Sequence, residues 1–441
     1  MTGGIRVRGL ACAALAAAGL VLLAGVGPVR AGVTKRVSVS SKGAQGDDDS
    51  GNSGVAISAD GRFVAFDSYA TTLVPGDSNG VPDIFVRDRV RGTTERVSLG
   101  PHGVQAEGGK GEGSYGPSIS GNGRFVAFSS YATNLVAGDT NGFEDVFVRD
   151  RESGTTERVS VGPHGVQANG SSDFPSISAN GRFVAFESHA ANLVPGDTNG
   201  AFDVFVHDRL KGTTERVSVG PHGRQGDNAS QGAAIAADGL FVVFQSYATN
   251  LVPGGDNGQI GVYVRDRARG VTELVSVGPR GARADDASFI GAISADGRFV
   301  AFGSFADNLV PDDTNGSFDT FVRDRLRDTT ERVSVASDGA QGNGGSGGPS
   351  ISANGRFVAF QSSATDLVPG DTNGELDIFV RDRVKGTTER VSVGPGGAQG
   401  DLGSFEVSIS GNGRLAAFSS EATNLVPGDT NRTEDVFVHH R

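Results

Sequence analysis

The chain has 441 residues and a formal net charge of −12 at pH 7. Glycine accounts for 68 of these residues, about twice its usual share, which indicates many tight turns. Nucleic acid and anionic membranes repel an acidic chain, so the charge excludes both as expected partners.

Residues 1–31 have the pattern of a secretory signal peptide. Arg6 and Arg8 form a basic start, an apolar stretch follows, and Ala31 ends a small-residue cleavage site. An uncleaved membrane anchor is the alternative. Removal of this segment takes three arginines, no acids and the only cysteine, so the mature net charge becomes −12 − 3 = −15. No later stretch could span a bilayer, so we expect a secreted or extracytoplasmic (periplasmic or cell-envelope) protein without membrane insertion.

Residues 32–441 carry an internal repeat with the core phrase GRFVAF. The arginine of this phrase, or the residue in its place, recurs at spacings of 62, 58, 58, 58, 58 and 58 residues: Arg62, Arg124, Arg182, Leu240, Arg298, Arg356 and Arg414. Fixed spacing predicts seven repeats of about 58 residues in one repeated architecture.

Each repeat predicts four short strands, as the third copy illustrates. A small-residue strand at Pro175–Ser178 meets an Asn-Gly hairpin turn and then the strand Arg182–Ser188. A longer link leads to the strand Asp203–Asp208. A short basic turn then leads to the segment Thr213–Gly220. The second and third strands are apolar on both faces and should be buried, whereas the fourth alternates like a half-exposed edge strand.

The four strands grade from a small inner one to a polar outer one, which is typical of propeller blades. The segment Thr34–Ser40 matches a fourth strand, and the last copy ends with its third strand at Asp435–Arg441. The sequence therefore predicts an all-β, closed seven-bladed β-propeller of four-stranded antiparallel blades, whose last blade is completed by the N-terminal strand. Such closure removes unpaired sheet edges. An open β-solenoid is the alternative.

The phrases SISADGRFVAF and DVFVRDRxxGTTERVSV resemble the TolB-type, WD40-like β-propeller repeat over about residues 34–441. The resemblance implies a propeller fold and a place in an envelope assembly. TolB itself carries a separate N-terminal α/β domain and six blades, whereas this chain has seven copies.

Six copies carry an acidic turn, D-[ST]-N-[GR]-x-x-D, between their second and third strands. Oxygen ligands at alternate positions, a glycine and a closing carboxylate suit calcium, and the turn partly resembles the FG-GAP calcium loops of integrin-like propellers. The candidate ligands are Asp77, Asn79, Asp83, Asp139, Asn141, Asp145, Asp197, Asn199, Asp203, Asp313, Asn315, Asp319, Asp371, Asn373, Asp377, Asp429, Asn431 and Asp435.

A turn without metal is the alternative interpretation, and we favour it. Asp and Asn side chains cap their own turns by hydrogen bonds to the backbone, and Asn-Gly adopts positive φ. The fourth copy has Gly255 and Gly261 in place of both acids and keeps its strand. The acids are therefore dispensable for the fold of that blade. Calcium is the only cofactor we consider.

Alternating strand direction places the links between the second and third strands on the same face as the links between blades. Both are long, so we expect function on this long-loop face. A glutamine recurs in the links between blades, where we expect backbone hydrogen bonds at Gln45, Gln105, Gln167, Gln225, Gln341 and Gln399. The turns with His102, His164 and His222 belong to different blades, so a shared metal site is not expected.

No catalytic motif stands out. The stretch GGSGG at Gly344–Gly348 lacks the strand and helix of a nucleophile elbow. We expect a monomeric, non-enzymatic propeller that binds a protein or glycan, with calcium as an optional stabiliser. The alternatives are an extracytoplasmic hydrolase or lyase with a site at the central channel, and a TolB-like component of an envelope assembly.

Overall fold

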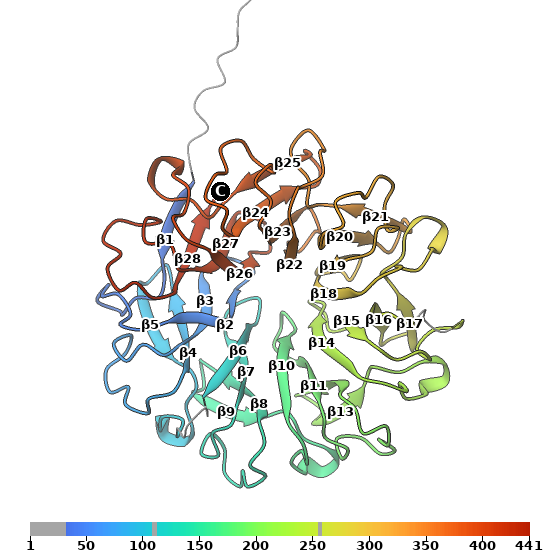
Figure 1. The fold of residues 1–441 in the computed structure, drawn as a ribbon. Coiled ribbons are helices and arrows are strands. Elements are labelled where there is room, and N and C mark those ends of the chain that lie inside the picture. The colour runs from blue at the N-terminus through green and yellow to red at the C-terminus, as the bar shows by residue number, and fades with distance from the viewer. Residues whose placement is uncertain (1–31, 108–112, 255–257) are drawn as a thin grey trace, which may run out of the picture. The chain divides into compact units, whose positions relative to one another are not determined.

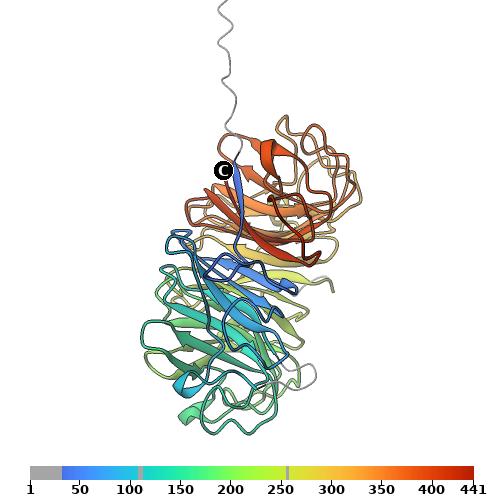
Figure 2. The ribbon, with the colours of Figure 1, turned by 90° about the vertical axis from the view of Figure 1, so that its left-hand side faces the viewer.

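The computed structural model describes residues 32–107, 113–254 and 258–441. Within these ranges the strands form seven separate four-stranded sheets, and all strand pairs within the sheets are antiparallel. Figure 1 shows the sheets as blades around a central axis, and Figure 2 shows the same ring from its edge. The predicted seven-bladed propeller is confirmed.

The innermost strands surround the axis. They are β2 (Ser50–Ile57), β6 (Ser114–Ile119), β10 (Ser172–Ile177), β14 (Ser230–Ile235), β18 (Ser288–Ile293), β22 (Ser346–Ile351) and β26 (Ser404–Ile409). Each begins earlier than the sequence indicated, because a serine such as Ser172 pairs with the end of the second strand. A shift of register interrupts each of these ladders soon after that first pair.

The second and third strands form the buried middle of each blade. The second strands are β3 (Phe63–Ser68), β7 (Phe125–Ser130), β11 (Phe183–Ser188), β15 (Phe241–Ser246), β19 (Phe299–Ser304), β23 (Phe357–Ser362) and β27 (Leu415–Ser420). The third strands are β4 (Asp83–Asp88), β8 (Asp145–Asp150), β12 (Asp203–Asp208), β16 (Gly261–Asp266), β20 (Asp319–Asp324), β24 (Asp377–Asp382) and β28 (Asp435–His440). In blade 3, Phe186 and Phe205 are fully buried with ring centroids 6.0 Å apart. Such stacked pairs supply much of the apolar core of each blade.

The fourth strands are shorter than predicted. They are β1 (Val33–Arg36), β5 (Thr93–Arg96), β9 (Thr155–Arg158), β13 (Thr213–Arg216), β17 (Val271–Leu274), β21 (Thr329–Arg332) and β25 (Thr387–Arg390). The half-exposed pattern holds only for these four residues, since Val217, Ser218 and Val219 are buried. The ladder stops because the Ser218 hydroxyl accepts the Val204 N–H at 3.1 Å and donates to Asp203 at 2.5 Å.

Short 3₁₀ turns begin five of the links between blades in the described ranges: η1 (Pro101–Gly103), η2 (Pro163–Gly165), η3 (Pro221–Gly223), η4 (Pro279–Gly281) and η5 (Pro395–Gly397). His102, His164 and His222 lie in three of these turns with φ near +60°. They occupy equivalent places in different blades and are exposed, as the sequence indicated.

The N-terminal strand closes the ring. β1 pairs with β28 from Val33 opposite His440 to Arg36 opposite Phe437, so strands from both ends of the chain share one blade. The guanidinium of Arg36 bonds Asp435 at 2.8 Å across this seam. No helix in the described ranges is long and apolar enough to cross a membrane. The predicted signal peptide, residues 1–31, lies outside the described residues.

We predict that the seam is sensitive to acid through His439, which is buried on β28 and hydrogen-bonded to Thr34 at 2.9 Å. Burial lowers the pKa of His439 to about 4, from 6.5 in an exposed imidazole. At this residue the unfolded chain binds more protons than the folded chain between these values, so the contribution of His439 to stability falls as pH drops from about 6.5 to about 4. The lost stability is at most about 3 kcal/mol.

Melting curves of the wild-type protein and the His439→Gln variant between pH 7 and pH 4 test this prediction. The variant should lose the part of the pH dependence that is due to this histidine. The exposed His222 offers a control, because His222→Gln should leave the pH profile unchanged. Parallel profiles for wild type and His439→Gln would contradict the prediction.

Candidate functional site

Each acidic turn is neutralised by an arginine from the fourth strand of the same blade. In blade 3, Nη1 of Arg216 lies 3.3 Å from Asp197 and 3.2 Å from Asp203. All three side chains are at most 8% exposed. The same bridge, with N–O distances of 2.8–3.5 Å, recurs at Arg36, Arg96, Arg158, Arg332 and Arg390.

The amides of each turn complete the network. The Asn199 amide donates to Asp203 at 3.2 Å, and the Gln225 amide donates to Asp197 at 2.8 Å and to Asp203 at 3.1 Å. The recurring glutamine therefore binds the acidic turn through its side chain. The expected backbone bond is present at Gln225, whose side-chain amide oxygen accepts the Thr198 N–H at 3.2 Å.

Blade 4 replaces the arginine, the glutamine and both acids of the network in its sequence. Leu274 stands where the other blades have the bridging arginine, Arg283 replaces the glutamine, and Gly261 begins the third strand in place of aspartate. Gly255, the other replacement, lies outside the described residues. Leu274 packs against the apolar cluster around Tyr263. Since acids and arginine are replaced together, the turns are built as internally paired charges.

The residues of the turns fit an arginine better than a metal ion. The Asp203 oxygens accept hydrogen bonds from Ser218, Asn199, Gln225 and Arg216, so a cation would have to displace these donors. Burial is the largest influence on the pKa of Asp203 and raises it, while these donors act in the opposite direction. The described residues contain no group of three His, Cys, Asp or Glu side chains placed to hold a metal. The calcium hypothesis remains a prediction, which a measurement below tests.

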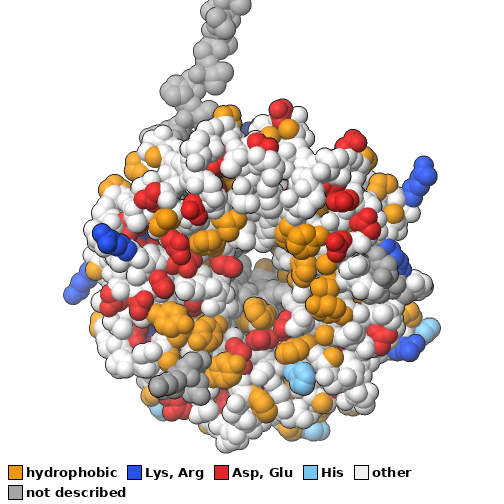
Figure 3. Space-filling view, in the orientation of Figure 1, with side chains coloured by type: hydrophobic (Ala, Val, Ile, Leu, Met, Phe, Trp, Pro, Cys, Tyr) orange, Lys and Arg blue, Asp and Glu red, His pale blue; other side chains and the backbone are white. Residues whose placement is uncertain are grey.

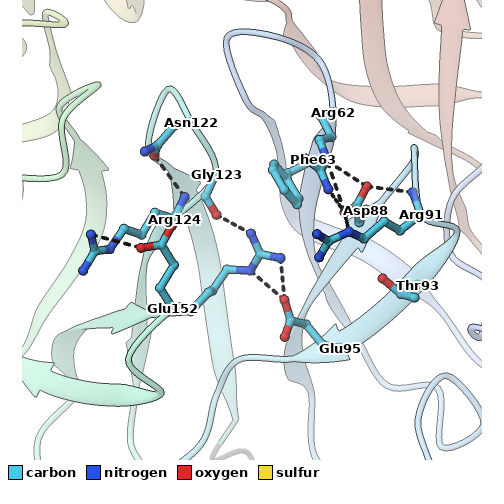
Figure 4. A pocket seen from close by; sticks show the side chains of 11 residues that line it. Arg62, Phe63, Asp88, Arg91, Thr93, Glu95, Asn122, Gly123, Arg124 and Glu152 are labelled. Carbon is cyan, nitrogen blue, oxygen red and sulfur yellow. Dashed lines mark hydrogen bonds and ion pairs between the residues drawn. The ribbon is translucent and has the colours of Figure 1, made fainter.

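A pocket of about 470 Å³ on the opposite, short-loop face is a junction between blades 1 and 2. Figure 4 shows that its charged groups are paired with one another. Arg62 bonds Asp88 at 2.6 Å, and Arg151 of the next blade bonds Glu95 at 2.5 Å. Both guanidinium groups lie over the ring of Phe63, at 4.7 and 4.4 Å from its centroid. These contacts hold neighbouring blades together and leave little unpaired charge for a ligand.

A larger cavity, of about 650 Å³, opens beside the inner strands of blades 1, 2, 3 and 7. The inner strands begin at the long-loop face, and the lining residues lie near those beginnings. We call these residues the channel-mouth site. They are Asn52, Ser53, Tyr115, Gly116, Ser129, Tyr131, Glu144, Asp173, Phe174 and Glu406.

The channel-mouth site is built from positions at which the repeats differ. The residue before the third strand is Pro82, Glu144, Phe202, Ile260, Phe318, Leu376 or Glu434, depending on the blade. The fifth residue of the second strand is Asp67, Ser129, Glu187, Gln245, Gly303, Gln361 or Ser419. Buried positions elsewhere in the repeat are nearly invariant from copy to copy. Variation confined to one place on a constant scaffold is typical of a binding site.

Blade 3 places two carboxyl groups directly opposite each other. Asp173 on β10 pairs with Glu187 on β11 in the ladder, where blade 4 has Gln231 opposite Gln245. Like charges in this arrangement repel. Burial and the neighbouring Glu187 raise the pKa of Asp173, so the pair holds a proton near neutral pH. Burial also raises the pKa of Glu187, whose carboxylate accepts the Gly232 N–H of the next blade at 2.5 Å.

Other carboxyl groups that line the cavity or lie near its lining residues also have raised pKa values. Burial raises the pKa of Asp67 to about 6 and that of Glu434 to about 7, and raises those of Glu144 and Glu406. Clusters of shifted carboxyl groups in a cavity are a mark of functional sites. We call Asp67, Glu144, Asp173, Glu187, Glu406 and Glu434 the acidic wall.

The backbone is strained at the channel mouth. Phe174 and Glu406 occupy the left-handed region, with φ of +48° and +45°, at a position where Gly116, Gly232 and Gly348 stand in other blades. Phe174 is also 61% exposed. A non-glycine residue in the left-handed region destabilises the fold, and such strained residues concentrate at functional sites. Both strained residues, Phe174 and Glu406, line the cavity with their side chains.

Blade 5 presents aromatic rings at the same positions. Phe289, Phe305 and Phe318 form a cluster with centroid distances of 4.7–6.5 Å, which we call the aromatic wall. Gly303 makes room for it, because a Cβ there would lie 2.3 Å from the Phe318 ring. Figure 3 shows hydrophobic side chains beside the central hollow over β14 and β18, with acidic side chains near the hollow over other blades.

The sequence identified the acidic turns and offered the central channel only as an alternative site, without naming the residues of the channel mouth. The residues that the repeats share identify the turns, whereas the positions at which the repeats differ identify the channel mouth. Aligning the seven copies by column would have singled out Glu144, Asp173 and Glu187. Only the ring shows that these columns converge on one cavity.

We predict that Arg216→Leu destabilises the protein strongly, because it leaves Asp197 and Asp203 buried without a counter-ion. Breaking a buried ion pair from one side costs about 3–5 kcal/mol. The triple variant Arg216→Leu/Asp197→Gly/Asp203→Gly copies blade 4 and should melt above the single variant. Thermal melting measures both. A single variant within about 1 kcal/mol of wild type would contradict the prediction.

We predict that calcium leaves the melting temperature of residues 32–441 unchanged, because arginine occupies the place of the cation. The comparison is between millimolar calcium and chelator at constant ionic strength. A ligand that binds only the folded state raises stability by mass action. A higher melting temperature in calcium would instead support the six turns as metal sites. The triple variant serves as a control that lacks one turn.

No protein-family model and no curated protein sequence matches the chain. Solved structures do match. TolB from Acinetobacter baumannii is 15% identical over 70% of this chain and 58% of its own length, with a TM-score of 0.39. An oligogalacturonate lyase in complex with manganese is 10% identical over 93% of this chain and 94% of its own, with a TM-score of 0.57.

The β-propeller domain of the Trilobed protease from Pyrococcus furiosus is 11% identical over 88% of this chain and 95% of its own, with a TM-score of 0.52. That domain is described as having an open velcro topology, whereas β1 closes the ring here. Identities this low show the fold alone. The chain is a seven-bladed β-propeller, the fold that the resemblance of its repeats to the TolB type implied, and TolB proteins are among the structures that match it.

Proposed function

We propose that the protein is a secreted, non-enzymatic propeller that binds a protein or glycan ligand in the channel-mouth site. The convergence of the repeat-variable positions on one cavity carries this proposal. Secretion rests on the pattern of residues 1–31, and a scaffold role in an envelope assembly would be one form of the same binding activity.

The dimensions and lining of the cavity support a ligand site. Its volume of about 650 Å³ lies in the usual range for ligand pockets. Tyr115 and Tyr131 offer rings that can stack on a sugar or a side chain, and the neighbouring carboxyl groups offer hydrogen bonds. The strained Phe174 adds an exposed apolar side chain.

The structural similarity to oligogalacturonate lyase does not identify the ligand of this cavity. Oligogalacturonate carries a carboxylate on each sugar, and the described residues that line this cavity include Glu144, Asp173 and Glu406 but no lysine or arginine. Repulsion at short range therefore disfavours that substrate class. A neutral or positively charged ligand suits the lining better.

The proposal is tested with a variant that copies blade 4 into blade 3. Asp173→Gln/Phe174→Gly/Glu187→Gln reproduces Gln231, Gly232 and Gln245, a combination that this fold already accommodates. The wild-type protein should bind specific members of an array of immobilised oligosaccharides and peptides. The variant should bind the same ligands at least about 10-fold more weakly, a loss of about 1.4 kcal/mol.

A control variant, Glu152→Gln, changes a charge in the short-loop pocket and should bind like wild type. Equal binding by wild type and the blade-3 variant would place the site elsewhere. Failure of the wild-type protein to retain any arrayed ligand would also contradict the proposal.

A hydrolase or lyase is the second candidate, and the Asp173–Glu187 pair favours it. A carboxyl group that keeps its proton near neutral pH can act as a general acid, while its partner acts as a base. The same blade-3 variant distinguishes the two functions. Chromatography of retained oligosaccharides after incubation would reveal new products with wild-type protein and none with the variant if the protein is an enzyme.

A further inference from the structure

The acidic turns and the acidic wall differ in whether the chain provides them with a positively charged partner. Each acidic turn receives a buried arginine from its own blade. By contrast, no residue of the acidic wall forms an ion pair with lysine or arginine in the described ranges. Figure 3 shows the same contrast, since the lysine and arginine side chains visible on this face lie towards its outer edge.

Two carboxyl oxygens of the acidic wall lack a hydrogen-bond partner within the described part of the chain. Asp67 is 1% exposed; its Oδ1 accepts the Ser53 N–H at 3.1 Å, and its Oδ2 accepts nothing. Asp173 lines the cavity and leaves its Oδ1 without a donor. A buried polar atom is costly without a partner, and Asp173 lines the cavity, where a ligand can supply the missing donor. Asp67 is bonded to Ser53, another residue that lines the cavity.

Aromatic rings stand beside the acidic wall. Tyr115 and Tyr131 line the cavity, and Tyr69 lies close enough to Tyr115 to hydrogen-bond it. Faces of tyrosine attract organic cations, most strongly when the cation is desolvated. The aromatic wall of blade 5, with Phe305 48% exposed, can receive apolar groups attached to such a cation.

We infer that the channel-mouth site binds an organic cation, an alkylammonium or guanidinium group, which supplies the counter-ion and hydrogen-bond donors that the described residues of the chain do not provide to the acidic wall. This inference rests on the proposed function and names the ligand class of the same site. The group can belong to a free polyamine or to lysine and arginine side chains of a polypeptide.

Isothermal titration of residues 32–441 at pH 7.5 and low salt tests the inference with four probes. They are spermidine, a ten-residue peptide of alternating lysine and glycine, the neutral sugar cellohexaose, and trigalacturonate. We expect one of the two cations to bind at one site per chain. Spermidine binding would point to a free polyamine, and binding of the peptide alone to a polypeptide.

Two variants with equal changes of charge separate a site from general attraction to an acidic protein. Asp173→Gln/Glu187→Gln removes two acids of the acidic wall, and Glu152→Gln/Glu375→Gln removes two exposed acids elsewhere. The first should weaken cation binding at least 10-fold, and the second should change it less than 2-fold. Equal weakening by both variants would overturn the inference, as would a cation affinity that neither variant changes.

The neutral and acidic probes distinguish this inference from the proposed function. If cellohexaose or trigalacturonate binds, the cations do not, and Asp173→Gln/Glu187→Gln abolishes the binding, the site is real and its ligand is not a cation. If none of the four probes binds, the inference is overturned. The proposed function is then judged by the arrays alone.

Discussion

Closure of the ring by β1 is the constraint on which the rest of the structure depends. β1 supplies the fourth strand of the last blade, so every blade is complete and both ends of the chain are held in one sheet. The backbone pairing of β1 with β28 is reinforced by Arg36, which bonds Asp429 and Asp435 more than 390 residues away in sequence. The same arginine-to-carboxylate bridge that tightens an ordinary blade thus also joins the two ends of the chain.

A closed ring of equal blades restricts where the sequence can vary. The stacked aromatic pairs, the bridging arginines and the serines that end the fourth strands are needed in nearly every copy, because each blade packs against two neighbours. The beginnings of the inner strands are freer, since they face the central channel. Function can therefore differ at the channel mouth without disturbing the packing between blades.

Two groups of acids in this protein, those of the acidic turns and those of the acidic wall, have opposite roles. Those in the turns are buried beside arginine, and their charge is satisfied by the fold. Those of the acidic wall are crowded together without such partners, and burial raises the pKa of Asp67 and Glu434. Unsatisfied charge at a cavity is a cost in stability that a ligand can offset. The fourth blade shows that a blade can form without the charged residues of the turn, because both acids and the arginine are replaced there and its four strands remain.

The sequence by itself determined the number of blades, the order of their strands and the closure at the seam, because these follow from local pattern and from equal spacing. It also identified the acidic turns, whose residues are neighbours in the chain. It could not show that Arg216 lies between Asp197 and Asp203, since the bridge depends on the register of β12 and β13. The sequence also could not show which residues meet at the channel mouth. Glu144, Asp173 and Glu406 come from three blades, and only the tertiary structure brings them around one cavity, because distance across the ring is unrelated to distance along the chain.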